Sequence, residues 1–549
     1  MKKFKIFHKH IVLLVASGFI MMFASCDDML TLESNRYVTS ENHQLKNSTD
    51  SVSSILGLLS GMQKIADRYV LMGEMRADLL DVTPLTTADI RELSNFKVRR
   101  DNPFADPRDY YALINNCNYF ISRTNGDDHP LKNEHALART IRAWTYMQVA
   151  SIWGQVYYTS QALLTVDDTH RELPLLQPLQ LVDSLINDLS PFEKSYFPNY
   201  GTINNFPSSR IFPSLRLLLA DLYLWRGSSP ADYEKAATLY AEVIDEKYQA
   251  IQAGTMPSVR WSYDNFIQQN FETAIPSNSW SASTVASSTS TETVSAILMA
   301  ANPSEGRVGK LPLKLNEFGF STVIDSLWGA QRFTLRQTSG AVSINYYVAG
   351  DLRKQANLSG TFAIDEFELP ALYKLLNCKN ILTYRMGLVW LRYAEAVNRT
   401  GKPHTAFAVL KYGLKPAVFN DPAKIPIRER ELAKSYLAPF NTLKYEWMTG
   451  VHARGCGDVA FDDDYDIAAF ADGSMDTLQW VENAIIDELA LETSFEGNRF
   501  ADLLRISQRR NNPDYLARKI ASKHRDNYQS IYQTLCSDTK NWFLPEPLN

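Results

Sequence analysis

Two segments of this 549-residue chain have the pattern of helical hairpins built to one plan, and this repeat limits the fold more than any other feature. The two hairpins are Leu215–Gly227 followed by Tyr233–Ile244, and Leu388–Gly401 followed by His404–Leu414. In both, an alanine (Ala220 or Ala394) lies seven positions before the turn glycine (Gly227 or Gly401). The small alanine side chain lets paired helices approach closely, and glycine permits the left-handed backbone that ends a helix.

The second helix of the first hairpin carries Ala236 and Tyr240, a spacing that resembles the second helix of a tetratricopeptide repeat. Apolar residues at three- and four-residue intervals predict further helices at 52–62, 111–121 and 137–153. We therefore predict a mainly α fold, a tetratricopeptide-like scaffold of helical hairpins with large insertions between its copies. The alternative is generic helix pairing with alanine at the contacts.

Residues 250–370 differ from these helical segments. They contain the Ser/Thr-rich stretch Ser277–Thr293, many aromatic residues, and alternating pieces such as Val342–Val348. Alternation of apolar and polar residues predicts short strands, and Ser/Thr-rich stretches predict loops. We predict a large, irregular, loop-rich insertion with a few short strands here, and a second, mostly loop segment at 415–480.

The first 26 residues have the pattern of an export signal that ends at a cysteine. Four lysines precede an apolar run, which is followed by two small residues and the cysteine: Lys2, Lys3, Lys5 and Lys9, then Ile11–Phe23, then Ala24, Ser25 and Cys26. The apolar run is shorter than the roughly 20 residues that span a bilayer, as in a cleaved signal. We predict a signal peptide over 1–25, lipidation of Cys26, a lipidated polar tether over 26–48, and a single domain over 49–549. Simple secretion is the alternative.

The remaining four cysteines are widely spaced: Cys117, Cys378, Cys456 and Cys536. They form no Cys-x-x-Cys pair, which disfavours a zinc site. Export would permit disulfides, although the sequence does not choose a pairing, and free buried thiols are the alternative. The net charge of −5 and the lack of a basic tract disfavour a nucleic-acid partner.

No catalytic motif is present: the sequence contains no GxSxG, HExxH or P-loop pattern. The nine histidines form no ligand pair at i, i+4. We therefore predict no catalytic site, no resident metal and no cofactor. The acidic run Asp462–Asp466 offers oxygen ligands for calcium but lacks the glycine and closing glutamate of an EF-hand, so a solvated acidic turn is the favoured interpretation.

Seven segments, in order, resemble characteristic segments of the SusD/RagB family of nutrient-binding outer-membrane lipoproteins of Bacteroidetes. They are Phe23–Leu30 (FASCDDML), Arg76–Asp78 (RAD), Tyr110–Ile121 (YYALINNCNYFI), Arg142–Gly154 (RAWTYMQVASIWG), Leu391–Lys402 (LRYAEAVNRTGK), Glu492–Arg505 (ETSFEGNRFADLLR) and Asn541–Pro547 (NWFLPEP). They extend over nearly the whole chain, and their number and order make the resemblance specific.

This resemblance implies a non-enzymatic protein that captures oligosaccharides, or in some members peptides, at the cell surface. The ligand would pass to a SusC-like TonB-dependent transporter, over which the lipoprotein sits as a lid. Two alternatives come from other classes of protein. One is a lipid-anchored, tetratricopeptide-like scaffold of the envelope, and the other is a glycoside hydrolase with an unrecognised pair of carboxylates.

A sugar-binding surface needs flat aromatic platforms and a few polar groups that bond hydroxyls. Candidate platforms in the irregular segment are Trp261, Tyr263, Trp280 and Trp328, and candidate polar partners in the early loop are Arg76, Asp78 and Asn95. Core packing is the alternative for each aromatic residue, and a buried structural pair is the alternative for Arg76 with Asp78. Four other tryptophans lie in helical stripes and are expected in the core: Trp144, Trp153, Trp225 and Trp390. Arg499 and Arg505 are expected to pair with Asp502.

Overall fold

The computed structural model describes residues 45, 48–125, 129–203, 206–251, 292–339, 342–364, 366–376, 380–446, 448–456, 465–467 and 476–546. The chain divides into two compact units, residues 1–46 and 47–549, and every described helix and strand belongs to the second. The predicted signal peptide, Cys26 and most of the predicted tether lie outside the described residues. Within the described part of the chain, no helix combines the length and hydrophobicity that crossing a bilayer requires.

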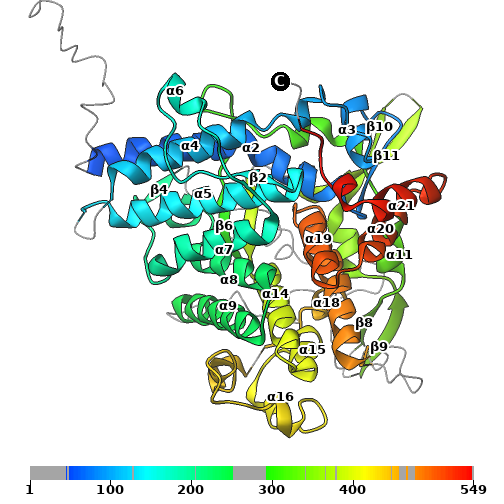
Figure 1. Cartoon of the computed structure of the whole chain (residues 1–549). Coiled ribbons are helices and arrows are strands. Elements are labelled where there is room, and N and C mark those ends of the chain that lie inside the picture. The colour runs from blue at the N-terminus through cyan, green and yellow to red at the C-terminus, as the bar shows by residue number, and fades with distance from the viewer. Residues whose placement is uncertain are drawn as a thin grey trace, which may run out of the picture. The chain divides into compact units, whose positions relative to one another are not determined.

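Three long helices pack together near the start of this unit: α2 (Ser48–Glu74), α4 (Arg108–Arg123) and α5 (Lys132–Trp153) (Figure 1). Along the chain, α2 and α4 are connected through β1 (Leu80–Val82), α3 (Ala88–Ser94) and η1 (Pro103–Ala105). Gly61 permits the contact of α2 with α4, because a Cβ there would lie 2.7 Å from Leu113 Cδ1. The predicted stripe at 111–121 is the buried face of α4, with Ile114 and Ile121 in the core.

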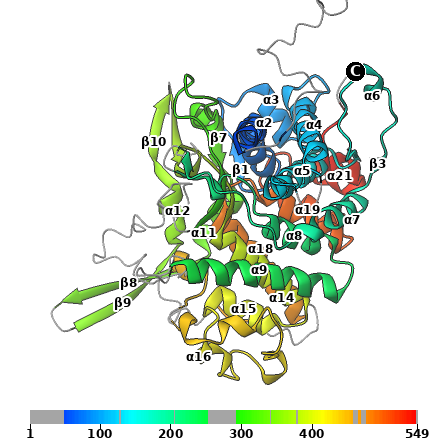
Figure 2. The same ribbon diagram turned by 90° about the vertical axis from the view of Figure 1, so that its left-hand side faces the viewer.

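Both predicted hairpins are present. The first is α8 (Leu215–Arg226) with α9 (Pro230–Ile251), and the second is α14 (Met386–Arg399) with α15 (Pro403–Lys411). Gly227 (φ +46°) and Gly401 (φ +83°) have positive φ, and Ala220 and Ala394 are fully buried. α14 also packs against α9, so the two hairpins lie side by side (Figure 2). The mainly helical fold with only small sheets is as predicted.

The described part of the irregular segment contains short two-stranded antiparallel sheets, as predicted. Its elements are β6 (Thr293–Ile297), η5 (Leu311–Glu317), β7 (Phe318–Phe320), α11 (Thr322–Gly329), β8 (Arg332–Ser339), β9 (Val342–Ala349), α12 (Leu352–Asn357), β10 (Leu358–Ile364) and β11 (Phe367–Leu372). It is followed by α13 (Tyr373–Leu376) and β12 (Ile381–Arg385). β7 pairs with β1, and β12 pairs with β6. The hairpin β8–β9 extends away from the helices (Figure 2).

Small elements connect α5 to α8 and fill the predicted loop segment at 415–480. The first group is β2 (Val156–Tyr157), α6 (Val166–Thr169), β3 (Leu175–Leu176), α7 (Pro178–Leu189), η2 (Ser190–Phe192), β4 (Thr202–Ile203), β5 (Phe206–Pro207) and η3 (Ser208–Arg210). The second group is α16 (Pro416–Phe419), η6 (Ile427–Glu429), η7 (Ala438–Phe440), η8 (Leu443–Tyr445) and α17 (Ala453–Cys456). The described residues of 415–476 thus form only single turns between loops, as predicted.

The C-terminal helices are α18 (Thr477–Thr493), α19 (Arg499–Arg509), α20 (Pro513–Ala521) and α21 (Tyr528–Ser537), followed by η10 (Thr539–Trp542) (Figure 1). They enclose an apolar core to which Trp542 belongs. The indole Nε1–H of Trp542 donates to the carbonyl oxygen of Leu535 at 2.7 Å. This bond fixes the place where the chain leaves α21 and begins its C-terminal tail.

Buried ion pairs join α12 and β12 to α18 and to the turn that follows α18. Arg385, at the end of β12, contacts Glu492 (Nη1–Oε1 2.7 Å) and Glu496 (Nε–Oε2 2.8 Å). Arg353, on α12, contacts Glu488 (Nη1–Oε1 2.5 Å). Burial opposes charge on Glu492, but its neighbouring arginines lower its pKa to about 2. Because each charge has a partner, burial of this network does not leave an uncompensated ion.

Cys117 and Cys456 are buried and Cys536 is half-buried, and none of these three residues is in a disulfide. Burial raises the pKa of Cys117 to about 12, which keeps it a thiol. Cys378 lies outside the described residues. The structure therefore favours the free-thiol alternative for these three residues.

Candidate functional site

A groove of about 1170 Å³ lies where several helix ends meet the C-terminal tail. We call it the C-terminal groove. Its wall comes from the ends of α3, α5, α8 and α19, the start of α7, the start of α20, and residues 539–546. Such a volume is typical of a site for an extended small-molecule or oligomeric ligand.

Four aromatic side chains line this groove and are only half-buried: Phe96, Trp153, Trp225 and Phe543. Trp153 and Trp225 had been expected in the core, but they are half-buried at its margin, where Trp225 packs against the C-terminal core and Trp153 lies 5.4 Å from the Tyr110 ring, centroid to centroid. Each lies at the C-terminal end of its helix. Trp144 (3% exposed) and Trp390 (1% exposed) are in the core as predicted.

The backbone around the groove adopts conformations that most residues avoid. Phe96 (φ +54°) and Asn511 (φ +46°) are two of the three non-glycine residues with positive φ among those described. A bulky residue in this region costs energy, of order 1–3 kcal/mol, and such costs gather at ligand sites. The packing around Phe96 and Asn511 therefore offsets the energy of their backbone conformations.

Gly154 allows the C-terminal tail to form another part of the wall. Its φ is +79°, and a Cβ there would lie 2.8 Å from the Phe543 ring. The N–H of Leu544 donates to the carbonyl oxygen of Ile152 at 2.9 Å, which ties the tail to the end of α5. The ring of Phe543 is thus held against the glycine that follows Trp153.

The polar part of the groove is rich in planar amides. These are Gln155, Gln177, Gln508, Asn511, Asn512 and Asn541. An amide can donate and accept hydrogen bonds at once, as a sugar hydroxyl can. Aromatic side chains and amides that line one groove can together contact a pyranose, which has one apolar surface and several hydroxyls.

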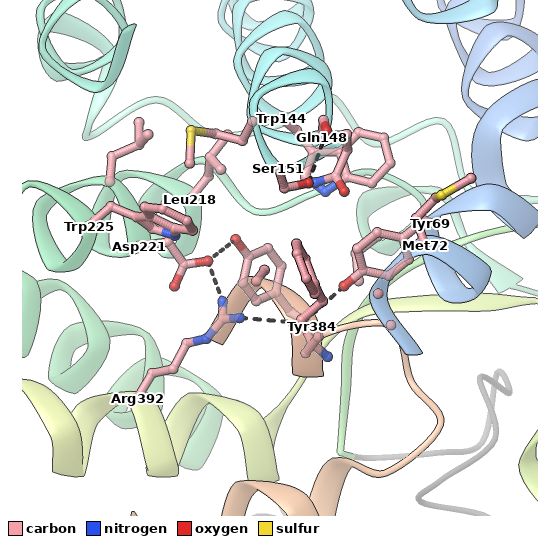
Figure 3. Close-up of a pocket in the computed structure, with 18 residues that line it drawn as sticks. Tyr69, Met72, Trp144, Gln148, Ser151, Leu218, Asp221, Trp225, Tyr384 and Arg392 are labelled. Carbon is pink, nitrogen blue, oxygen red and sulfur yellow. Dashed lines mark hydrogen bonds and ion pairs between the residues drawn. The ribbon is translucent and has the colours of Figure 1, made fainter. Parts of the chain in front are cut away.

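A second, small cavity of about 70 Å³ lies deeper between α2, α5, α8, β12 and α19, and we call it the small cavity. Figure 3 shows Asp221 facing Tyr384 and Arg392. Asp221 Oδ2 accepts from the hydroxyl of Tyr384 at 2.6 Å and from Arg392 Nη1 at 2.5 Å, and Oδ1 accepts from the hydroxyl of Tyr240 at 2.5 Å. Although burial opposes the charge, Asp221 and Asp502 hold the pKa of Arg392 well above its usual range. This cavity has its charges paired internally.

Of the predicted platforms, Trp261, Tyr263 and Trp280 lie outside the described residues. Trp328 is fully buried (0% exposed), with its ring 5.8 Å from Phe320 and 6.5 Å from Phe495, centroid to centroid. A platform must offer a face to solvent, so the prediction for Trp328 is corrected: it is a core residue of α11 that packs against β7 and the turn between α18 and α19.

The predicted polar partners are not brought together. Asp78 is fully buried and binds Arg499 (Oδ1–Nε 2.7 Å, Oδ2–Nη2 2.9 Å), so it is a structural residue. Asn95 lies at the C-terminal end of α3, where its N–H donates to the carbonyl oxygen of Arg91. Only Arg76 lines the C-terminal groove. Arg505 does pair with Asp502, at 2.7 Å, whereas Arg499 does not.

Sequence reasoning missed Trp153, Trp225 and Phe543. A signal was available for the two tryptophans, because each stands one or two residues before a glycine that ends its helix. The position of Phe543 depends on tail contacts with α5 and could not be read from spacing. In the part of the chain that the structure describes, no three His, Cys, Asp or Glu side chains gather as a metal site requires.

Comparison with protein families finds the SusD family over residues 376–549. The matched region contains α14, α15 and the C-terminal helices, including the part of the C-terminal groove formed by α19, α20 and the tail. No curated protein matches the chain in sequence.

Solved structures show that the SusD-like fold extends beyond this region. A SusD superfamily protein from Bacteroides vulgatus is similar with a TM-score of 0.58 and 14% identity, covering 91% of this chain and 96% of that one. Surface glycan-binding protein A from Bacteroides uniformis has a TM-score of 0.56, with the same identity and coverage. The surface glycan-binding protein A from Bacteroides thetaiotaomicron, solved in complex with laminarihexaose, has a TM-score of 0.54, again at 14% identity and the same coverage. At these identities the similarity establishes the fold.

Proposed function

We propose that this protein binds oligosaccharides at the cell surface and delivers them to a SusC-like TonB-dependent transporter. A lipid on Cys26 would hold it at the outer membrane. The observation that carries the proposal is the C-terminal groove, where Trp153 and Trp225 lie half-buried among six planar amides. The SusD-like fold supports it, because two of the similar structures are of surface glycan-binding proteins.

Binding is tested by titrating the full chain, purified in detergent, with a panel of oligosaccharides. We expect Trp153→Ala and Trp225→Ala each to weaken binding roughly three- to tenfold, because each removes a stacking face. Trp480→Ala is the matched control, since Trp480 is also half-buried but packs against Phe407 and does not line the groove. Equal effects of all three changes would argue against the groove as the site.

The same titration separates binding from catalysis. Release of reducing ends at catalytic rates would favour a glycoside hydrolase instead. Delivery is tested by purifying the protein from membranes. Recovery of a large β-barrel transporter supports the proposal, and its consistent absence would favour an envelope scaffold.

Anchoring is tested with Cys26→Ala. Loss of the acylated cysteine should release the protein from the membrane fraction, because stable anchoring depends on the acyl chains. A mutant protein that stayed in the membrane fraction with no partner present would contradict the anchor.

A further inference from the structure

More basic than acidic residues line the C-terminal groove. Six basic residues line it: Arg76, Lys97, Arg226, Arg505, Arg509 and Lys540. A single acidic residue, Glu546, also lines it. A concave surface of one charge sign focuses the electrostatic field and attracts ligands of the opposite sign.

Three of these cations are neutralised by carboxylates of the protein. Arg226 binds Asp232, with Nε 3.1 Å from each carboxylate oxygen. Arg505 binds Asp502 at 2.7 Å, and Arg509 binds Glu395 at 2.7 Å. These three residues are therefore structural, and their charges are compensated within the fold.

The other three, Arg76, Lys97 and Lys540, have no carboxylate within ion-pair distance among the described residues. Lys97 and Lys540 are exposed at the groove. They are free to move toward an anionic ligand without breaking an existing pair.

Arg76 is the unusual member, because it is only 1% exposed and is held by neutral groups. Nη1 donates to the carbonyl oxygen of Ser151 at 3.2 Å, Nη2 donates to the carbonyl oxygen of Trp542, and the guanidinium lies 4.0 Å from the centre of the Phe500 ring. Burial lowers the pKa of Arg76 to about 9, so it remains charged at neutral pH. A buried charge without a counter-ion is costly, and a nearby anion would offset that cost.

We propose that the C-terminal groove binds an acidic oligosaccharide, one whose sugars carry carboxylate or sulfate groups. The sugar rings would lie on Trp153 and Trp225, and the acidic groups would be drawn to Lys97 and Lys540 and to the field of Arg76. This inference rests on the proposed glycan-binding function and specifies the ligand class.

The test uses the full chain in detergent and calorimetric titration with matched ligands. Hexagalacturonate and its methyl ester differ in carboxylate charge, and a chondroitin sulfate hexasaccharide and its desulfated form differ in sulfate. Laminarihexaose is the neutral reference glycan, and hexaglutamate is an acidic peptide. The variant is the double substitution Lys97→Gln/Lys540→Gln.

The control variant is Lys132→Gln/Lys194→Gln, which changes the net charge equally. Both lysines are exposed and do not line the groove. Lys132 begins α5, a helix of 22 residues whose last residue is Trp153, and at 1.5 Å per residue the two lie roughly 30 Å apart.

We expect at least one acidic glycan to bind roughly tenfold more tightly than its neutral match. The Lys97→Gln/Lys540→Gln variant should weaken that binding roughly three- to tenfold, and the control variant should not. The galacturonate and chondroitin pairs distinguish carboxylate from sulfate recognition.

Three results would overturn the inference while leaving glycan binding intact. They are tighter binding of a neutral glycan than of every acidic one, an acidic preference that both double variants leave unchanged, and an acidic preference that both weaken equally. Binding of hexaglutamate in place of any glycan would point to a peptide ligand and overturn it as well. Binding of no glycan at all would overturn the proposed function itself.

Discussion

Trp225 lines both the small cavity and the C-terminal groove, but the buried arginines at the two sites have different partners. In the small cavity, Arg392 is met by Asp221 and Asp502. In the groove, Arg76 is met by two carbonyl oxygens and an aromatic ring. Both arginines are buried, and they differ in whether a carboxylate is their partner.

The largest expected effect comes from breaking the paired arginine. Arg392→Met removes the cation and leaves Asp221 buried with only hydroxyl donors, so we expect a loss of about 3–5 kcal/mol in the free energy of unfolding. Arg76→Met is the matched change, and because it strands no carboxylate it should cost less than half as much. Urea denaturation of the two variants measures the difference, and equal losses would show that the carboxylate partner of Arg392 does not set the cost of losing the arginine.

The free energy of unfolding should depend on pH differently through Glu74, beside the small cavity, and Glu395, beside the C-terminal groove. The contribution of Glu74 should change by about 3 kcal/mol. Glu74 accepts N–H bonds from Phe495 and Gly497, which borders the small cavity, and burial raises its pKa to about 7. The folded state therefore holds this proton more tightly than the unfolded state. Its contribution is complete below about pH 4.5 and is lost as the pH rises to 7.

The unfolding free energy of the wild type relative to Glu74→Gln should accordingly fall between pH 4.5 and 7. Glu395→Gln is the control on the groove side. Burial disfavours the charge of Glu395, but Arg505 and Arg509 lower its pKa to about 2. Its contribution is present above about pH 4.5 and is lost only as the pH falls toward 2, so the Glu395→Gln difference should stay level from pH 5 to 7. A level Glu74→Gln difference over the same range would contradict the assignment.

Gly154→Ala should lower the free energy of unfolding by about 1–2 kcal/mol more than Gly401→Ala does. Gly154 and Gly401 both have positive φ, so alanine strains the backbone at each. A Cβ at 154 would meet the Phe543 ring at 2.8 Å, whereas nothing lies within 4 Å of a Cβ at 401. Gly154→Ala should therefore destabilise the protein more and also weaken glycan binding. If thermal unfolding showed the two variants to be destabilised equally, the C-terminal tail would move away from a Cβ at position 154 without loss of stability.

The smallest effect is expected at the free lysines of the groove. Lys97→Gln and Lys540→Gln should each change the free energy of unfolding by no more than about 0.5 kcal/mol, because both side chains are exposed and neither forms an ion pair with a described residue. Denaturation curves that overlay the wild type would confirm this. A larger loss would show that these lysines support the fold as well as face the ligand.

Much of the fold could be predicted from spacing alone. The hairpins followed from apolar periodicity and from Gly227 and Gly401, since the period of a helix and the conformational freedom of glycine are local properties. The strand at 342–349 followed from alternation in the same way. Local rules also placed Trp144 and Trp390 correctly in the core.

The site was predicted much less well. Trp328 satisfied the composition of a sugar platform but is enclosed by Phe320 and Phe495, which come from other elements. Trp153 and Trp225 satisfied the periodicity of core residues but lie at helix ends that face the groove. Exposure depends on which distant segments cover a side chain, and periodicity carries no information on that.

By itself the sequence determined the helical hairpins, their turns and the resemblance of ordered segments to the SusD/RagB family, and it predicts the lipid on Cys26. Only the tertiary structure decided which charges are compensated. Asp78 pairs with Arg499, 421 residues away, and Asp221 pairs with Arg392, 171 residues away, whereas Arg76 meets only neutral groups. The physical reason is range: helix periodicity acts over a few residues of chain, but an ion pair requires two atoms within about 4 Å in space, wherever the chain brings them.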